Sequence, residues 1–183
     1  IQTITNNALA SPYTLGITAS ASFGAAIAIT LGLSVAGYLW IGTALLALVF
    51  ALAVSLLIFY LGRLKGMSTS TLILSGIIMN FFFQALQQYL QYRASPEIAQ
   101  IISGWTFGNL QRSSWMSVVV SGCLLVMGAA LLSGWSWRLT VLTTGEERAR
   151  SLGINVERLR LHVFLICSFL IAGAVGFIGT VAF

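Results

Sequence analysis

A row of side-chain amides is the most unusual polar feature of this sequence. The row interrupts an apolar stretch and consists of Asn80, Gln84, Gln87 and Gln91. In an α-helix, spacings of four, three and four residues place all of these amides on one face, with Gln88 beside them. Amides in hydrocarbon need hydrogen-bonding partners, so this face must contact other helices or water. Hydrogen bonding between helices and the lining of a solvated pathway both remain open.

A second polar feature is a short arginine-rich segment between two apolar runs. Thr144 and Glu147 have the spacing of a capping box, which opens a helix, and Gly153 suits a left-handed helix end. Asn155 can then cap a second helix that continues into the next apolar run. The segment predicts a helix, a tight turn and a helix that project from a membrane surface. A solvated charged loop is the alternative.

Motifs for catalysis are missing from the sequence, which contains no HExxH, Walker A, GxSxG or Rossmann pattern. The single histidine, His162, has no acidic or thiol neighbour to pair with, and we interpret it as a polar anchor at the membrane interface. Cys123 and Cys167 are far apart within apolar runs, where small buried hydrophobic residues are the expected interpretation. We therefore expect no enzyme, no cofactor and no metal site.

The composition indicates that lipid is the solvent for which this chain is built. Of its 183 residues, 58% are hydrophobic and 7% are charged, whereas charged residues make up about a quarter of a soluble domain. The net charge of +5 does not indicate nucleic-acid binding, because the basic residues occupy short gaps between apolar runs rather than one stripe.

Long apolar runs must form the elements that position these polar features. Runs that can cross roughly 30 Å of hydrocarbon as helices cover residues 15–36, 38–61, 71–90, 116–132 and 163–183. Aromatic residues gather at their ends, as expected at the headgroup level. The predicted fold class is all-α, a polytopic transmembrane helix bundle. None of these runs contains a charged residue, so any transport must draw its energy from outside the chain or from a downhill gradient.

The basic residues predict the orientation of the bundle. Arg63 and Lys65 follow the second run, and several arginines lie between the fourth and fifth, whereas only Arg93 and Arg112 lie between the third and fourth. The positive-inside rule places the first two connections, and residues 1–13, in the cytoplasm.

The loop after Arg93 is expected outside and contains a predicted short helix. Ser95 as N-cap and Pro96 at the first position open this helix, and Gly104 can close it. Its apolar residues suit a helix that lies on the membrane surface or against the bundle. Docking of an external partner is the alternative.

Three stretches of the sequence match signatures of one transport family. Residues 6–16 are similar to Asn-Pro-Leu-Ala-x-Pro-x-x-Leu-Gly, with Ala8 where Pro is usual. Residues 145–155 resemble the cytoplasmic motif Gly-Glu-x-x-Ala-x-x-Leu-Gly, and residues 176–179 match the start of Gly-Phe-Ile-Gly-Leu-x-x-Pro-His. Over its whole length the chain thus resembles the FecCD/BtuC-like permease family of iron-siderophore, haem and cobalamin ABC importers.

The resemblance implies a fold and a set of partners. It implies a single, partial permease domain over residues 1–183, with a cytoplasmic coupling loop at about 138–160. This domain corresponds to the third to seventh spans of a roughly ten-span fold. It implies a non-catalytic subunit of the bacterial cytoplasmic (inner) membrane that moves a chelate with ATP hydrolysed by a partner. The implied partners are a cytoplasmic ABC ATPase dimer, a second permease subunit, an external substrate-binding protein and membrane lipid, without nucleic acid.

The resemblance also implies roles for the two polar features. The amide row would flank the translocation pathway. The ATPase contact would be formed by Glu147, Arg148, Arg150, Ser151, Leu152, Gly153 and Asn155. Two other functions are consistent with a membrane helix bundle. A channel or secondary transporter does not explain the capped arginine-rich turn. A non-transporting structural membrane subunit is the second alternative.

Overall fold

The described part of the chain is entirely helical apart from its connections, which confirms the predicted fold class. The computed structural model describes residues 1–8, 10–35, 37–66, 68–108 and 115–180. Its helices are α1 (Gln2–Thr5), α2 (Ile17–Leu31), α3 (Leu39–Leu64), α4 (Thr69–Arg93), α5 (Pro96–Thr106), α6 (Trp115–Ser133), α7 (Ser136–Thr143), α8 (Glu146–Ser151) and α9 (Val156–Ile178). Arg112 of the predicted outer loop lies outside the described residues.

Helices long and apolar enough to cross a membrane account for most of the described chain. They are Leu39–Leu64, Ser70–Arg93, Trp115–Ser133 and Val156–Gly176. The predicted runs 38–61, 71–90 and 116–132 agree with α3, α4 and α6 within a few residues. Helix α9 begins at Val156 with Asn155 as its N-cap, as predicted, and it continues into the apolar run that starts at 163.

The predicted first span, 15–36, was too long at both ends. Helix α2 has 15 residues and is bounded by Gly16 and Gly32, whose φ angles of 68° and 61° are left-handed. These conformations are open to glycine and stop the helix on both sides. With 15 residues, α2 is shorter than the ~20 residues that usually cross a bilayer.

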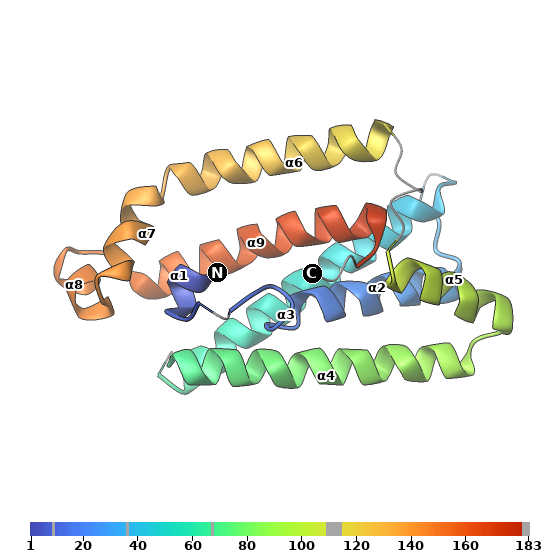
Figure 1. Cartoon of the computed structure of the whole chain (residues 1–183), viewed down its shortest axis with the longest axis horizontal. Helices are drawn as coiled ribbons and strands as arrows, with labels where there is room; N and C mark the ends of the chain where they lie inside the picture. The colour runs from blue at the N-terminus through green and yellow to red at the C-terminus, as the bar shows by residue number, and fades with distance from the viewer. Residues whose placement is uncertain (9, 36, 67, 109–114, 181–183) are drawn as a thin grey trace.

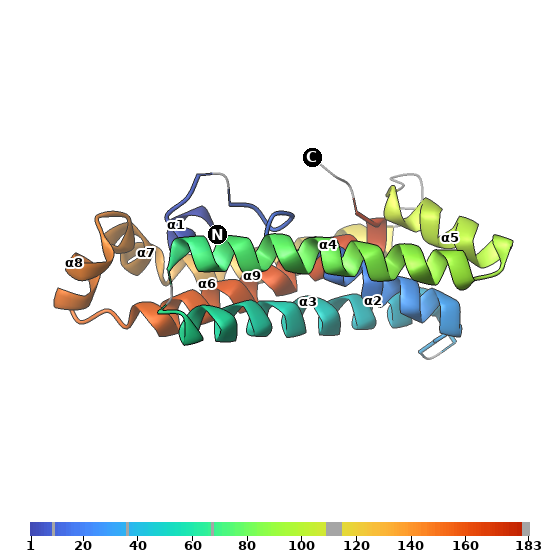
Figure 2. The same cartoon turned by 90° about the horizontal axis from the view of Figure 1, so that it is seen from below.

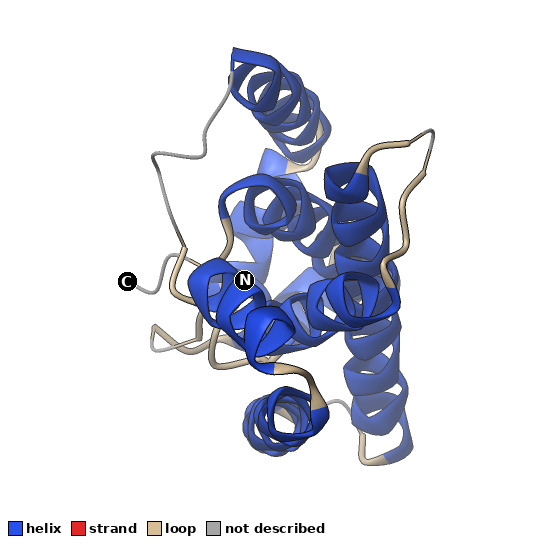
Figure 3. Cartoon of the chain, turned by 90° about the vertical axis from the view of Figure 1, so that its right-hand side faces the viewer, coloured by secondary structure: helices blue, strands red, loops and turns tan. Residues whose placement is uncertain are grey.

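The centre of the bundle is formed by α2, α3 and α9, which lie between α6 and α4 in Figure 1. Figure 3 shows the bundle from one end. Helix α4 packs on α2 and α3, and α6 packs on α9 at the opposite side. Small residues bring the central helices close together: a Cβ at Gly24 would lie 2.5 Å from the carbonyl oxygen of Leu46, and one at Gly176 would lie 3.0 Å from Ala44. Ser55 of α3 and Ser168 of α9 add a buried hydroxyl pair between the helices.

The two basic connections lie at the same end of the bundle. Figure 1 shows the α3–α4 connection and the α7–α8 turn at one end, and α5 with the α2–α3 connection at the other. Arg63 lies in the last turn of α3 at the first end, and Arg93 ends α4 at the second. This arrangement agrees with the expected separation of charges, and the cytoplasmic side of the first end remains a prediction.

Helix α5 packs against the bundle. Ser95 caps it as predicted, its hydroxyl accepting from the Ile98 N–H at 3.5 Å, with Pro96 at the first position. The expected end at Gly104 was wrong, because the helix continues to Thr106. Ile102 is fully buried against α2, and the Thr180 hydroxyl beyond α9 donates to the Thr106 carbonyl.

Between α1 and α2 the chain is irregular and runs beside α4. The described residues of this stretch, 6–8 and 10–16, are hereafter the entry segment (blue in Figure 2). A Cβ at Gly16 would lie 2.8 Å from the Asn80 nitrogen, and one at Gly76 would lie 2.6 Å from the Leu15 Cα. At 1.5 Å per residue, Gly76 and Asn80 lie roughly 10 and 16 Å along α4 from Thr69. If α4 spans the membrane, the entry segment therefore reaches membrane depth.

The entry segment satisfies much of its own backbone. The Ser11 N–H donates to the Thr14 hydroxyl at 2.8 Å, and the Thr14 N–H donates to the Ser11 hydroxyl at 3.1 Å. The Thr14 hydroxyl in turn donates to the Ser11 carbonyl at 2.9 Å, and the Leu15 N–H donates to the same carbonyl. Irregular backbone is tolerated at membrane depth only where such partners, protein or a cavity surround it.

The contact between the entry segment and α4 should be sensitive to a single methyl group. Gly76→Ala should lower the free energy of unfolding by about 1–3 kcal/mol, because the new Cβ meets the Leu15 backbone. Gly122→Ala in α6 is the matched control, since a Cβ there meets no atom within 4 Å, and it should be stabilising by roughly 0.5–1 kcal/mol. Thermal unfolding in detergent gives both values. Equal stability of the two variants would contradict this packing.

Candidate functional site

The amide row lies on the protein-facing side of α4. Asn80 and Gln87 are 7% and 6% exposed, Gln84 and Gln91 are half-buried, and Gln88 is exposed. The structure thus brings the predicted row onto one face, as its spacing required. The opposite face of α4 is apolar and exposed, and carries Leu74, Ile78, Phe81, Phe82 and Tyr89.

The partners of the amides come from two neighbouring elements and from the row itself. The Gln84 side-chain nitrogen donates to the Asn80 side-chain oxygen at 3.1 Å and to the Tyr13 hydroxyl of the entry segment at 3.3 Å. The Gln87 side-chain nitrogen donates to the Thr106 hydroxyl of α5 at 2.6 Å. Gln87 therefore connects helices. Gln84 occupies an accessible edge, because its partner Tyr13 is 49% exposed.

Aromatic rings support α4 from within the bundle. Phe83 of α4 lies 5.6 Å from Phe23 of α2 and 6.2 Å from Phe50 of α3, measured between ring centroids. Phe23 and Phe50 meet edge to face at 5.4 Å. Edge-to-face contacts of this kind fix helices in register. The aromatic cluster consequently holds the amide face of α4 in position.

The arginine-rich segment forms the predicted helix, turn and helix, but its first cap differs from the prediction. The capping box of Thr144 and Glu147 was wrong: Gly145 is the N-cap of α8, and the Thr144 hydroxyl donates to the Val141 carbonyl at 2.8 Å. The physical reason is α7, which the sequence analysis did not predict. Thr144 ends α7 and satisfies one of its last carbonyls instead of opening α8.

The second half of this turn is formed as predicted. Gly153 has a φ of 78°, and its N–H donates to the Arg150 carbonyl at 3.0 Å. The Ile154 N–H reaches the Ala149 carbonyl at 3.0 Å, which closes the helix end. The Asn155 side chain accepts from the Arg158 N–H at 3.0 Å and caps α9. The turn is therefore held by hydrogen bonds on both sides.

All the residues predicted to contact an ATPase are exposed. They are Glu147, Arg148, Arg150, Ser151, Leu152, Gly153 and Asn155. Leu152 is 65% exposed at the tip of the turn. Arg150 does not project freely, because it pairs with Glu146 at 2.8 Å within α8. Arg148 makes no ion pair with the described residues, so its charge is available to a partner.

Sequence reasoning missed the role of Arg160, which was grouped with the basic residues of the loop. Its Nε donates to the Ile4 carbonyl at 2.9 Å and a terminal nitrogen pairs with Glu146 at 3.2 Å. A helical period could have revealed its burial, because it shares the inward face of α9 with Val156, Leu159, Val163 and Phe164, all buried.

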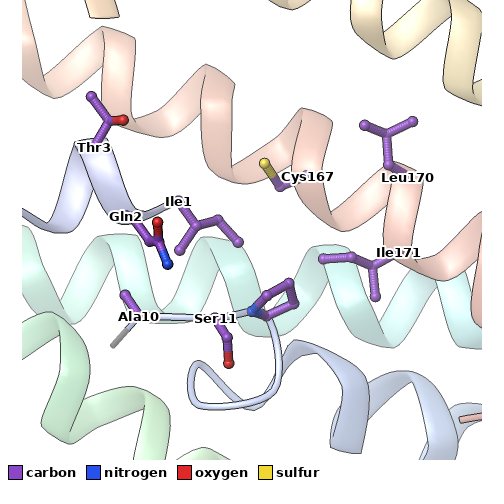
Figure 4. Close-up of a pocket in the computed structure, with 9 residues that line it drawn as sticks. Ile1, Gln2, Thr3, Ala10, Ser11, Cys167, Leu170 and Ile171 are labelled. Atoms are coloured by element: carbon purple, nitrogen blue, oxygen red, sulfur yellow. The ribbon is translucent and has the colours of Figure 1, made fainter. Parts of the chain in front are cut away.

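A pocket of about 460 Å³ lies between the N-terminal part of the chain and α9 (Figure 4). Ile1, Gln2 and Ser11 line one side and Cys167 and Ile171 line the other. The lining is neutral and mostly apolar, which does not identify a ligand. The expected burial of the cysteines was wrong for Cys123, which is exposed on α6.

Comparisons with known proteins agree with each other. The profile of the FecCD transport family matches residues 1–183. A Methanocaldococcus jannaschii protein assigned as an ABC transporter permease is 33% identical over 191 residues, covering 100% of this chain and 55% of that protein. The cobalamin import system permease protein of Halobacterium salinarum is 30% identical over 184 residues, covering 100% and 48%.

A solved structure extends the comparison to three dimensions. It is an inward-facing conformation of a transporter assigned to the metal-chelate ABC type, with a TM-score of 0.86 and 29% identity, covering 98% of this chain and 56% of that one. The chain thus spans about half the length of the proteins that it matches.

Gln87 and Gln88 provide a matched test of the amide face. Gln87→Leu should lower the free energy of unfolding in detergent by about 0.6–2 kcal/mol, because it removes the bond to Thr106. Gln88→Leu should not be destabilising, since Gln88 is exposed on the same helix. A Gln87→Leu variant as stable as Gln88→Leu would show that the bond between α4 and α5 contributes nothing.

Proposed function

Because this chain belongs to the FecCD transport family, we propose that it is part of the transmembrane permease of a binding-protein-dependent ABC importer. The chain is a multi-pass membrane protein of the non-catalytic permease type. The importer would use ATP hydrolysed by a separate subunit.

The observation that carries this proposal is the α8 turn. It projects at one end of the bundle (Figure 1), its tip residues are exposed, and both of its ends are fixed by hydrogen bonds. A permease without a nucleotide site can respond to ATP only through a part that contacts the ATPase and follows its conformation. A short helix fixed at both ends transmits displacement better than a flexible loop.

The proposed cargo is a metal chelate such as an iron-siderophore, haem or cobalamin. The cobalamin permease and the metal-chelate transporter among the similar proteins support this class. The proposed location is the bacterial cytoplasmic membrane. The α8 end would face the cytoplasm, since Lys65 and most arginines lie at that end.

The proposed partners follow from the two ends of the bundle and its exposed faces. A cytoplasmic ABC ATPase dimer would bind α8, and an external substrate-binding protein would bind at the α5 end. A second permease subunit and lipid would share the exposed apolar faces, such as that of α4 with Phe81 and Phe82.

We place the translocation pathway at the amide row and the entry segment. Transporter binding sites commonly combine helix ends and irregular backbone near the middle of the membrane. Here Gly16 opens α2 directly beside Asn80, and Tyr13 contacts Gln84 at the accessible edge of the row. The arrangement offers neutral hydrogen-bonding groups to a polar cargo, with no charged side chain in the amide row or in the described residues of the entry segment.

Gln84 tests the pathway. Gln84→Leu in the full-length permease should reduce cargo uptake by about tenfold, which corresponds to 1.4 kcal/mol in the barrier, while assembly with the ATPase is maintained. Gln88→Leu on the exposed face should leave uptake unchanged. Uptake of radiolabelled chelate and co-purification measure the two quantities. Parallel losses of assembly and uptake would mean that the row only holds helices together.

Arg148 tests the contact with the ATPase. Arg148→Glu should weaken co-purification of the ATPase by about tenfold or more, since a charge-assisted contact contributes about 1.5–3 kcal/mol. Arg93→Glu, at the opposite end of the bundle, applies the same charge change and should leave binding intact. If Arg148→Glu binds the ATPase normally, α8 is an ordinary solvated turn.

A further inference from the structure

Arg160 joins three parts of the chain that lie far apart in sequence. It belongs to the first turns of α9, its Nε donates to the Ile4 carbonyl of α1, and its terminal nitrogen pairs with Glu146 of α8. The first of these bonds spans 156 residues. Its side chain is 4% exposed, whereas that of Glu146 is 36% exposed. A buried cation with two directed partners fixes its surroundings more firmly than a surface pair does.

The chemistry of the guanidinium suits this position. Its planar group donates in several fixed directions, so one side chain can bond a carbonyl and a carboxylate at the same time. The Ile4 carbonyl lies at the end of the four-residue helix α1, where carbonyls have no intrahelical partner. Arg160 supplies that partner and holds α1 against α9.

From α1, packing continues to the amide row. Ile4 and Thr5 are fully buried, and Ile4 belongs to the same core as Leu15 and Ala149. Leu15 precedes Gly16, which contacts α4 at Asn80. Arg160 thus joins α8 to α1. The buried core that contains Ile4 of α1 also contains Leu15 of the entry segment, which lies next to the amide row.

We propose that Arg160 is a positioning residue that ties α8 to α1, so that a displacement of α8 moves the entry segment beside the amide row. This role rests on the proposed function of α8 as the ATPase contact. Beyond that function, it assigns to Arg160 a mechanical connection between α8 and α1. Glu146 contributes to the same tie, since it contacts both Arg150 and Arg160.

The connection between α8 and α1 through Arg160 can be measured without a transport assay. Spin labels at Gln2 and Leu152, both exposed, report the distance between α1 and the tip of the α8 turn in the full-length permease. We expect a narrow distance distribution in the parent protein and a broad one in Arg160→Met. Arg158→Met is the control, because the exposed Arg158 side chain lies on the same helix. An equally narrow distribution in Arg160→Met would overturn the proposal.

The coupling role requires a second readout in the assembled transporter. Arg160→Met should retain ATP hydrolysis while cargo uptake per ATP falls by roughly tenfold, within the range of allosteric coupling. Arg160→Lys keeps the charge but not the planar fork, so it should assemble and hydrolyse ATP normally without restoring uptake per ATP. Full restoration by lysine would show that charge alone suffices and would overturn the positioning role.

The two proposals can fail separately. If the parent permease binds no ATPase, the proposed function fails, while the spin-label distances still decide whether Arg160 ties α8 to α1. If Arg160→Met does not accumulate, Arg160→Lys carries the test, and a narrow distribution with normal uptake per ATP then overturns the proposal. Suppose that both variants bind the ATPase and show unchanged uptake per ATP. This result would support the proposed importer and contradict the positioning role of Arg160.

Discussion

The structure depends on how irregular backbone is accommodated beside a membrane-spanning helix. Within the hydrocarbon region, each peptide group that is not in a helix must find a hydrogen-bonding partner in the protein, because lipid chains offer none. In the entry segment, Ser11 and Thr14 bond each other's backbone, and Gly16 and Gly76 allow the segment to approach α4 closely. That approach places Asn80 beside Gly16, at the start of α2. The amide row and the entry segment are therefore two halves of one polar region in an otherwise apolar bundle.

A second constraint separates the charges from this region. Arg63, Lys65 and the α8 arginines lie at one end of the bundle, while the spans carry neutral groups through most of their length. Arg160 is the exception, since it is buried at the border between the charged end and the core. Its bonds to Ile4 and Glu146 connect the projecting α8 turn to α1. Charged groups at one end and neutral amides along α4 are consistent with the proposal that the energy for transport comes from outside the chain.

Periodicity and caps predicted the parts of this structure that depend on local rules. The amide row follows from the helical repeat, and Gly153 and Asn155 end and begin helices as glycine and asparagine commonly do. Tertiary contacts decided what local rules could not. Thr144 ends the unpredicted α7 rather than opening α8, and Gly104 lies within α5. Residues 15–36 do not form one helix because Gly16, which packs against Asn80, and Gly32 adopt left-handed conformations that end α2 on both sides. In the sequence, Arg160 is one of several arginines close together. Only its position on the inward face of α9 distinguishes it from the others.

The proposed pathway along the amide row and the entry segment should be accessible to water, and the reactivity of an introduced cysteine can detect this. In a full-length permease with Cys123 and Cys167 replaced, a single cysteine at position 84 would be treated with a membrane-impermeant thiol reagent in the assembled transporter. A cysteine at position 78, on the exposed apolar face of α4, provides the comparison. The account predicts that position 84 reacts, that bound cargo slows this reaction, and that position 78 stays unreactive. A position 84 that is as unreactive as position 78, in an assembled transporter that is active, would contradict it.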